Sequence, residues 1–289
     1  MEMIADIVVQ HENVTIINQE NQGISVARNK AISIAKGEYI LMLDSDDLIV
    51  DNSIPVLLGV ALADRPDFVV ADFVVMTNEE IEKYQGVVQK DFAYDEIRGD
   101  KIYLELFNPW QCYVWRALYR RDFLISNYIS FIPGIRYEDI PFSNECYLKA
   151  DRCIKTQWLL NIYRKRPESI TGTFTKSHVR DFGVALGATW DLQLSTNLPS
   201  QVRYQLEENV FVSFSLLIYN IIKTLKTSSE REEAVKIINS VAPHLNFRHN
   251  LRQKITTLLL KNFPFVFIDF YYLYSKIVYK SRSTQIIPH

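Results

Sequence analysis

The stretch that decides the fold reads NQGISVARN at residues 21–29 and KGEYILMLDSDD at residues 36–47. The pattern predicts a helix capped by Ser25, a tight exit at Gly37, and a buried central parallel strand over 39–43 that ends in an acidic cluster. Open α/β sheets bind ligands at the carboxyl ends of their strands. Three carboxylates so close together repel one another unless a cation or a set of donors neutralises them. A divalent metal that carries phosphate oxygens is one arrangement that does so.

The composition favours a soluble globular chain. Its 289 residues suit one large domain, or a catalytic domain with a smaller appendage. Hydrophobic residues make up 48%, which is enough apolar material for a sizeable core. The formal net charge of −2 gives no electrostatic reason to expect a nucleic-acid partner. The 3 cysteines form no C-x-x-C pair, which fits a reducing cytoplasm and argues against a disulfide scaffold or a zinc site.

Hydrophobic periodicity outlines an α/β region up to about residue 175. Apolar and β-branched runs predict strands over 14–17, 39–43, 68–75, 114–119 and 154–163. Helical spacing predicts the end of a helix over 2–10 and further helices over 26–35, 53–63, 100–107, 122–127 and 140–150. The polar stretch 77–100 shows no regular pattern. We therefore expect a sheet flanked by helices.

The character of the sequence changes near residue 180. Segments of helical period follow at 180–195, 201–226, 230–242, 247–261 and 264–280. Proline and serine turn signals separate them. We expect a first domain over residues 1–175 and a helical C-terminal region over residues 176–289.

The acidic cluster is the first candidate site. Residues i and i+2 at the end of a strand point the same way, so Asp44 and Asp46 can converge on one ligand. Mg²⁺ or Mn²⁺ prefers such oxygen ligands and usually completes its shell with substrate phosphates. The alternative is a solvated turn that closes the strand, with Asp47 capping the next helix. His178 is a weaker candidate for a further metal ligand, because a lone histidine is more often not one.

Arg28 and the pair Glu138-Asp139 are the other charged candidates. Arg28 lies in the first turn of a predicted helix, where an arginine suits a phosphate or nucleotide, although an ordinary surface arginine fits equally well. The acidic pair opens a predicted helix, a place where carboxylates are common for dipole reasons alone. The functional alternative is a general base, with one carboxylate held near an acceptor hydroxyl.

Aromatic and basic residues cluster before the acidic pair and at the end of the α/β region. Trp115 can stack on a sugar ring, and Arg116 can hold a diphosphate. The alternative is that the aromatic residues pack in the core and the basic residues lie on a solvated face. Arg166 can cover a phosphate or simply decorate its loop.

These segments resemble the core signature of family-2 glycosyltransferases of the GT-A fold. Residues 21–47 are similar to N-x-G-x-x-x-A-R-N, A-x-G-E-Y-I and L-D-S-D-D. Residues 115–122 resemble W-x-x-L-Y-R-R-D, residues 137–142 resemble Y-E-D-x-x-F, and residues 163–171 resemble Y-R-x-R-x-x-S-I-T. Four segments in the family's order make the resemblance specific over residues 14–171. The helical region after residue 180 has no counterpart in the signature.

The resemblance implies a Rossmann-like mixed sheet of the GT-A type, a nucleotide-diphosphate-sugar donor, and Mg²⁺ or Mn²⁺. It implies inverting transfer of the sugar to a hydroxyl of a glycan or lipid-linked acceptor in surface polysaccharide or glycolipid synthesis. Asp139 is the implied base, with Glu138 beside it shaping the acceptor site. Asp44 and Asp46 are the implied metal ligands. The implied donor-binding residues are Asn21, Gly23, Arg28, Asp44 and Asp46.

The chain departs from the family pattern in two places. Ala117 stands where the family usually has a basic residue, and Arg116 is its neighbour. Family members also open with a strand–helix–strand portion that cradles the nucleotide base, and this sequence begins near the helix that follows it. We therefore expect a product truncated at its N-terminus or one with a late assigned start. The alternative function is an inactive remnant or interaction module that keeps the fold and lacks the donor pocket.

The aromatic tail over 261–282 is flanked by lysine and arginine. Such a segment can lie on an anionic membrane surface, and the alternative is a packed terminal helix. We expect a cytoplasmic protein with, at most, peripheral contact with the inner face of the plasma membrane.

Overall fold

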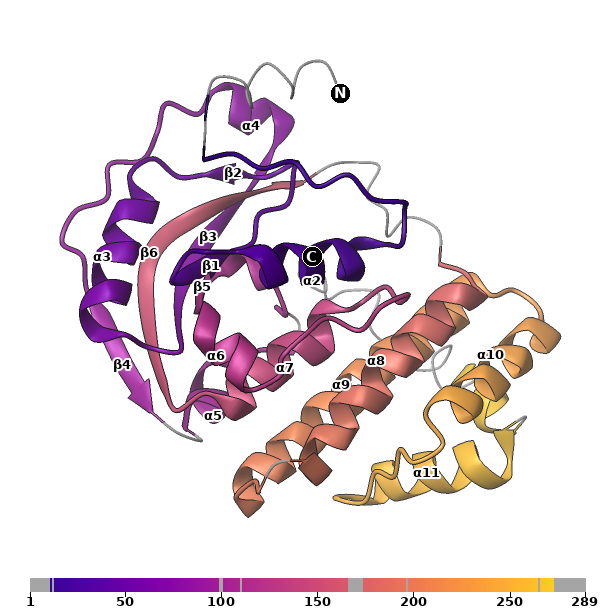
Figure 1. Cartoon of the computed structure of the whole chain (residues 1–289). Helices are drawn as coiled ribbons and strands as arrows, with labels where there is room; N and C mark the ends of the chain where they lie inside the picture. Colours follow the sequence, from indigo (N-terminus) through magenta and orange to yellow (C-terminus); the bar gives the residue numbers. More distant parts are fainter. Residues whose placement is uncertain are drawn as a thin grey trace.

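The computed structural model describes residues 11, 13–98, 101–109, 111–165, 174–195, 197–264 and 266–272, in which an α/β part is followed by a helical part (Figure 1). The strands are β1 (Tyr39–Leu41), β2 (Leu48–Ile49), β3 (Phe68–Thr77), β4 (Tyr94–Arg98), β5 (Ala117–Arg120) and β6 (Arg152–Lys165). The helices of the α/β part are α2 (Ile24–Ile34), α3 (Ser53–Asp64), α4 (Asn78–Glu82), α5 (Lys101–Leu106), α6 (Arg121–Ser126) and α7 (Asp139–Lys149). The helical part contains α8 (Lys176–Ser195), α9 (Ser200–Thr224), α10 (Ser228–Val241) and α11 (Leu251–Asn262).

The sheet of the described residues has six strands. Five of them follow the order β1-β5-β3-β6-β2, and β4 pairs with the N-terminal part of β6. The central pair β3·β6 is parallel, whereas every other pairing is antiparallel. This confirms the expected mixed sheet. The parallel pair brings the carboxyl ends of β3 and β6 to one edge, next to the turn that follows β1.

Alternation along β3 explains how helices cover both faces of the sheet. Phe68 and Val70 pack in one cluster with α2, α6 and α7, while Val69 and Ala71 pack in another with Leu57 of α3. All four β3 side chains are buried. Figure 1 shows α3 on one side of the sheet and α2, α6 and α7 on the other.

The strand before the acidic cluster differs from the prediction of a central parallel strand. β1 spans only Tyr39–Leu41, is antiparallel to β5, and ends the strand order among the described residues. The apolar run was nevertheless a correct sign of two covered faces. Tyr39 and Leu41 pack against the α3 cluster, and Ile40 packs against the opposite one. An apolar run indicates that both faces of a strand are covered by other elements. It does not indicate whether the neighbouring strand is parallel or antiparallel.

The start of the described chain also differs from prediction. Residues 14–17 form no strand, since β-branched side chains alone do not make one without a pairing partner. Helix α2 begins one residue before Ser25, and its N-cap is Gly23 at φ 85°, a conformation that glycine adopts without strain. Ser25 is therefore not the cap. The helix ends at Ala35, whose extended backbone breaks it, so Gly37 is not its C′ residue.

Most remaining elements match the predicted ranges within a few residues, and the predicted strand over 114–119 begins as a turn of 3-10 helix at Val114–Arg116 before β5. The polar stretch 77–100, for which no element was predicted, contains α4 and β4. Helix α4 is too short for a periodic signal and is defined by a capping box between Thr77 and Glu80. The predicted segment 2–10 lies outside the described residues.

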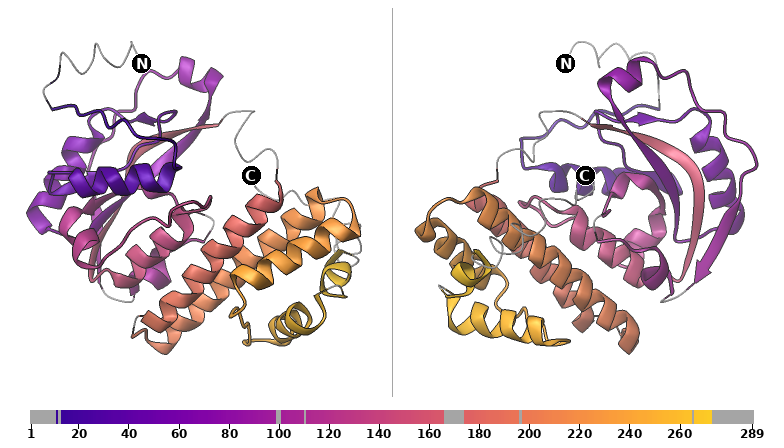
Figure 2. Two further views of the ribbon diagram at one scale, coloured as in Figure 1. Left: turned by 45° about the vertical axis from the view of Figure 1, so that its right-hand side comes forward. Right: turned by 180° about the vertical axis from the view of Figure 1, so that it is seen from behind.

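Helices α8 to α11 share a hydrophobic core, in which α8 and α9 lie side by side (Figure 2). A buried hydrogen-bond chain ties this core to the α/β part. The Asn209 amide donates to the Tyr103 hydroxyl (3.0 Å), which donates to Asn144 Oδ1 (2.7 Å), so α9, α5 and α7 are joined. Residues 264 and 266–272 continue as a helix, with Phe267 and Ile268 fully buried. This supports packing for that part of the tail; 273–280 lie outside the described residues.

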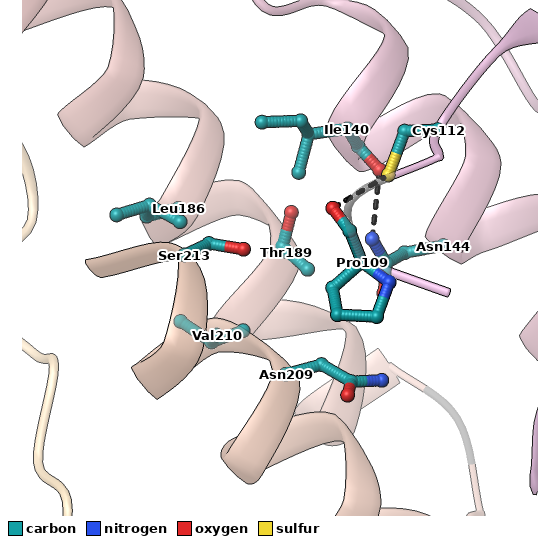
Figure 3. Close-up of a pocket in the computed structure, with 9 residues that line it drawn as sticks. All are labelled: Pro109, Cys112, Ile140, Asn144, Leu186, Thr189, Asn209, Val210 and Ser213. Carbon is teal, nitrogen blue, oxygen red and sulfur yellow. Dashed lines mark hydrogen bonds between the residues drawn. The ribbon is translucent and has the colours of Figure 1, made fainter. Parts of the chain in front are cut away.

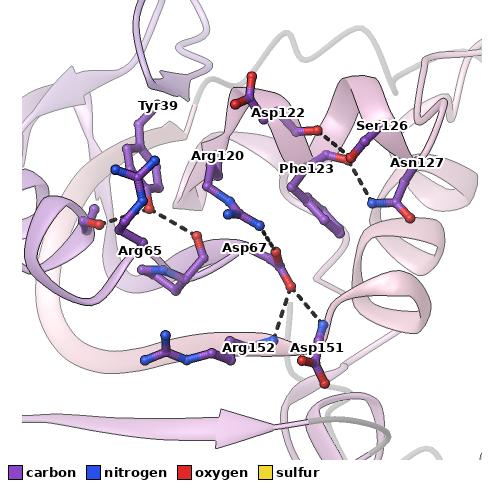
Figure 4. A network of polar contacts seen from close by, with 12 residues as sticks. Tyr39, Arg65, Asp67, Arg120, Asp122, Phe123, Ser126, Asn127, Asp151 and Arg152 are labelled. Carbon is purple, nitrogen blue, oxygen red and sulfur yellow. Dashed lines mark hydrogen bonds and ion pairs between the residues drawn. The ribbon is translucent and has the colours of Figure 1, made fainter.

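A polar network fastens β3, β5 and β6 at the end of the sheet opposite to the acidic cluster (Figure 4). The buried Asp67 carboxylate pairs with Arg120 and accepts from the backbone N–H groups of Asp151 (2.7 Å) and Arg152 (3.1 Å). The Tyr39 hydroxyl donates to the Pro66 carbonyl (3.0 Å) nearby. A paired and hydrogen-bonded carboxylate of this kind holds three strands in register.

None of the described helices combines the length and the apolar character that crossing a membrane requires.

Candidate functional site

A cavity of about 740 Å³ opens where the N-terminus of α2, the turn after β1, and the N-termini of α7 and α8 converge. Its lining includes Gly23, Ser25 and Arg28 from α2 and its cap, and Asp44 from the turn. Glu138 and Asp139 enter from the start of α7, with aromatic side chains from the strands beside them. The main candidates from three separate sequence segments therefore meet in one cavity.

Arg28 forms the centre of this arrangement. Its guanidinium donates to Asp44 Oδ1 (2.7 Å) and to Glu138 Oε1 (2.8 Å), and it lies 5.3 Å from the centre of the Phe131 ring. Only 14% of the Arg28 side chain is exposed, so these are charge-assisted bonds in a partly desolvated place. Arg28 thus links α2, the end of β1 and the start of α7, and it is not an ordinary surface arginine.

The carboxyl of Asp139 is the most perturbed acid of the cavity. Its pKa is raised to about 7, chiefly by burial and next by the neighbouring Glu138 carboxylate. Arg28 and the backbone N–H groups of Asp139 and Ile140 act in the opposite direction. A carboxyl with a pKa near neutral pH is suited to take up and release a proton.

The acidic turn fits a divalent cation in the chemistry of its donors. One oxygen of Asp47 accepts from the Arg164 N–H (2.9 Å), and the other is buried without a hydrogen-bond partner. Burial raises the pKa of Asp47, and the charges of Asp46 and Asp44 add to this. Mg²⁺ and Mn²⁺ prefer hard oxygen ligands, and they are commonly bound by one or two carboxylates together with the phosphates of a substrate. The cap of α3 is Asn52, so Asp47 does not cap that helix.

The described side chains alone do not complete a metal site. Within the described ranges, no three histidine, cysteine, aspartate or glutamate side chains converge as a metal-binding group. His178 lines the same cavity as Asp44, and its Nδ1 is hydrogen-bonded to the Thr175 hydroxyl (2.8 Å). Its role as a ligand stays a prediction. Asp46 is next to Asp44 in the turn and does not line the cavity itself.

An aromatic stack forms one wall of the cavity. Tyr113, Trp115 and Tyr163 lie with nearly parallel rings, 4.8 Å apart for the first pair and 5.7 Å for the second. Phe73 meets Trp115 edge-on at 5.0 Å. Flat faces of this kind can support a nucleotide base or a sugar ring.

The loop before α7 is held in a conformation that ordinary residues rarely adopt. Tyr137 has φ 62°, and its ring stacks on Phe182 of α8 at 4.5 Å. Arg136 pairs with the buried Asp181 of the same helix (2.8 Å). Contacts with α8 therefore stabilise a strained turn that immediately precedes the acidic pair. Backbone strain of this kind is concentrated at functional sites.

Two predicted site residues have another partner, and a third cannot be placed. The Arg116 guanidinium donates to the Ala71 carbonyl (3.2 Å) and pairs with Asp72 on β3, so it does not line the cavity. Asn21 accepts from the Gly23 N–H (3.2 Å) and shapes the turn before α2. Arg166 lies outside the described residues.

Sequence reasoning missed several lining residues, namely Gln22, Tyr113, Gly134, Arg136 and Asp181. Arg136 precedes Tyr137 and the acidic pair, which could have marked it. Asp181 carries no local signal, because it arrives on a helix from the other part of the chain.

Comparison with known proteins supports the family. Residues 2–125 match the sequence profile described as Glycosyl transferase family 2. A glycosyltransferase of Escherichia coli K12, YibD, is 28% identical over 137 residues, covering 46% of this chain and 40% of that protein. Glycosyltransferase GlyG of Streptococcus pneumoniae is 29% identical over 149 residues, covering 50% of each chain. The matched region thus spans half or less of the length of these relatives.

Solved structures show the same fold. Crystal structures of S. aureus TarS in complex with UDP-GlcNAc and with UDP align with TM-scores of 0.65 and 0.64. They cover 98% and 99% of this chain and 81% of that one, at 18% and 16% identity. The alignment includes the helical region, so the architecture is shared beyond the part with the sequence signature. Residues 2–125 are thus similar to glycosyl transferase family 2, and the chain shares the fold of these glycosyltransferase structures.

Proposed function

We propose that the chain is an inverting, metal-dependent glycosyltransferase that moves a sugar from a nucleotide-diphosphate-sugar to an acceptor hydroxyl. One observation carries the proposal. A single cavity holds Arg28 and Asp44, which suit a metal-bound diphosphate, together with Asp139, a carboxyl whose pKa near 7 suits a base.

The donor side of the cavity combines several features that fit a nucleoside diphosphate. Asp44 and Asp46 would hold Mg²⁺ or Mn²⁺, which stabilises the diphosphate leaving group when bound. Arg28 would donate to the diphosphate, since its bonds to Asp44 and Glu138 already place it there. The Ser25 hydroxyl is buried at the N-terminus of α2 without a partner, and a phosphate oxygen there would satisfy it. The aromatic wall would support the base or the sugar.

Asp139 would act on the acceptor. Its ionised carboxylate accepts the proton of the acceptor hydroxyl while that oxygen forms a bond to the anomeric carbon. The bond from the anomeric carbon to the diphosphate oxygen breaks, and the nucleoside diphosphate leaves with its electron pair. Attack on the face opposite to the leaving group inverts the anomeric configuration. The charge of Glu138 is held by Arg28, so Asp139 is the group free to take the proton.

Release of UDP from UDP-sugars in the presence of Mn²⁺ tests the activity. We expect turnover that Asp46→Ala abolishes and that Asp122→Ala leaves intact, because the Asp122 side chain is 80% exposed and outside the cavity. Folded protein that neither binds a nucleotide nor releases one would instead support the alternative, a remnant or interaction module that keeps the fold.

We also propose that the outer face of α11 contacts an anionic membrane surface, as suits a cytoplasmic enzyme acting on a lipid-linked glycan. Leu251, Ile255 and Leu258 are exposed on one stripe of this helix. The helix carries Arg252, Lys254 and Lys261 and no acidic residue. This combination of exposed apolar and basic side chains is typical of helices that lie on membranes.

Flotation with phosphatidylglycerol vesicles tests the membrane proposal. We expect the protein to float with the vesicles and Leu258→Asp to remain in solution. Leu62→Asp is the matched control, because Leu62 is equally exposed, at 48% against 54%, on α3. Equal flotation of both variants would contradict the proposal. Point variants are preferable to removing residues 263–289, because Phe267 and Ile268 belong to the core.

A further inference from the structure

A second cavity, of about 410 Å³, adjoins the candidate site on its helical side. Three residues, Tyr113, Tyr137 and Asp139, line both cavities. The remaining lining comes from Ile140 of α7, from the loop before β5, from α8 and its approach, and from α9. Asp139 therefore stands between a cavity that contains Arg28 and Asp44 and one that contains neither.

The reaction geometry distinguishes the two cavities. An inverting base must contact the acceptor hydroxyl, which attacks from the face opposite to the leaving group. Because the groups suited to the diphosphate lie in the first cavity, the acceptor approaches Asp139 from elsewhere. The second cavity reaches the same carboxyl without passing Arg28 or Asp44.

The lining of the second cavity is amphipathic. Aromatic rings from Tyr113, Tyr137, Phe174 and Phe182 provide flat apolar faces. Such rings suit the carbon skeleton of a sugar or polyol. Ser213, Asn220 and Thr224 of α9 provide hydroxyl and amide groups that can bond to its hydroxyls.

Among the described residues that line this cavity, Lys223 is the one basic residue. It lies on the last turn of α9, is exposed to solvent, and takes part in none of the ion pairs between described residues. Its Nζ lies 5.8 Å from the centre of the Tyr219 ring. An ammonium at an open rim, without an ion-pair partner among the described residues, is available for an anionic group such as a phosphate.

The other end of the cavity is closed. Four of its residues also line the narrow gap between α7, α8 and α9 in Figure 3, namely Pro109, Cys112, Ile140 and Ser213. This gap has no room for a water molecule. An acceptor therefore enters from the solvent side, where Lys223 lies.

We propose that the second cavity is the acceptor subsite, and that it takes a sugar or polyol whose phosphate group is held by Lys223 while a hydroxyl faces Asp139. This rests on the proposed function. It assigns part of acceptor choice to the helical region, because α9, α8 and the approach to α8 supply seven of the 13 lining residues.

Saturation-transfer NMR on the full chain loaded with UDP and Mg²⁺ tests the proposal, with sn-glycerol 3-phosphate and glycerol as probes. We expect Lys223→Gln to weaken glycerol 3-phosphate at least about tenfold, the effect of losing a charge-assisted bond. Glycerol should be unaffected. Lys226→Gln is the control, since it removes the same charge three residues away and outside the lining. Dihexanoyl-phosphatidylglycerol distinguishes a lipid-borne phosphate from a soluble one: tighter binding than glycerol 3-phosphate indicates the lipid source, and weaker binding the soluble one.

Filling the cavity provides a second variant. Leu216→Trp should abolish the signals of both glycerol probes while UDP affinity, measured separately by calorimetry, stays within about twofold. Undiminished probe signals in both Lys223→Gln and Leu216→Trp, or no signal from either probe in the wild type, would overturn the acceptor subsite. If the wild-type chain does not bind UDP at all, the proposed function itself is refuted. The failure of the acceptor subsite and the failure of the proposed function are therefore distinguishable.

Discussion

Asp139→Asn should lower activity and raise stability at the same time. Burial raises the pKa of Asp139 from its ordinary 3.8 to about 7. A folded-state pKa above the unfolded value means that the folded chain binds more protons between these limits, so stability is present at low pH and falls as pH rises toward 7. A difference of roughly 3 pKa units corresponds to at most ~4 kcal/mol. Asparagine cannot ionise, so the variant escapes this loss.

Chemical unfolding at about pH 4.5 and about pH 8 measures this effect. The variant should be more stable by only about 1 kcal/mol at the lower pH, which is just above the ordinary pKa of 3.8, and by up to ~4 kcal/mol at the higher one. Activity should rise with pH through about 7 in the wild type and fall by about 10²- to 10⁴-fold in the variant, the usual contribution of a general base. Equal stability of the two proteins at both pH values would refute a raised pKa. Undiminished turnover would refute the role of Asp139 as base.

Three further variants test the surroundings of the site. Arg28→Gln should move the acidic limb of the activity profile to higher pH, because Arg28 lowers the pKa of Asp139; an unchanged limb in a pH–rate profile would contradict this coupling. Tyr163→Ala should weaken UDP about fivefold in calorimetry, equivalent to ~1 kcal/mol of stacking of the nucleotide on the aromatic wall that Tyr163 forms with Trp115, and unaltered affinity would remove the aromatic wall from the donor site. Asp67→Ala should lower the free energy of unfolding by about 3 kcal/mol without changing UDP affinity, because it leaves buried N–H groups and an arginine unpaired far from the cavity; a change below about 1 kcal/mol would show that the network adds little.

Sequence periodicity predicted the long elements well because their burial is regular. β3 and β6 cross the centre of the sheet, and α3 and α7 press one apolar face against it, so each leaves a clear pattern. Short elements were less visible. α4 is defined by one capping box, and the antiparallel pairing of β1 with β5 depends on a strand about 80 residues later in the chain.

The candidate site was predictable where its residues sit at the ends of elements. Arg28, Asp44 and Asp139 each follow or open a helix or strand, and the structure brings them to one cavity. The partners of Arg116 on β3 could not be predicted because they are distant in sequence, and its role at a diphosphate stays a prediction. The contributions of Asp181 and Lys223 were invisible for the same reason, since both arrive on helices of the C-terminal region.

Calorimetric titration of UDP into the full chain, with and without Mg²⁺, tests the central claim most directly. We expect binding that depends on the cation and disappears in Asp46→Ala, while Asp122→Ala binds as the wild type does. Absence of binding to the folded wild-type chain, or equal binding by Asp46→Ala, would contradict a metal–diphosphate site at the end of β1.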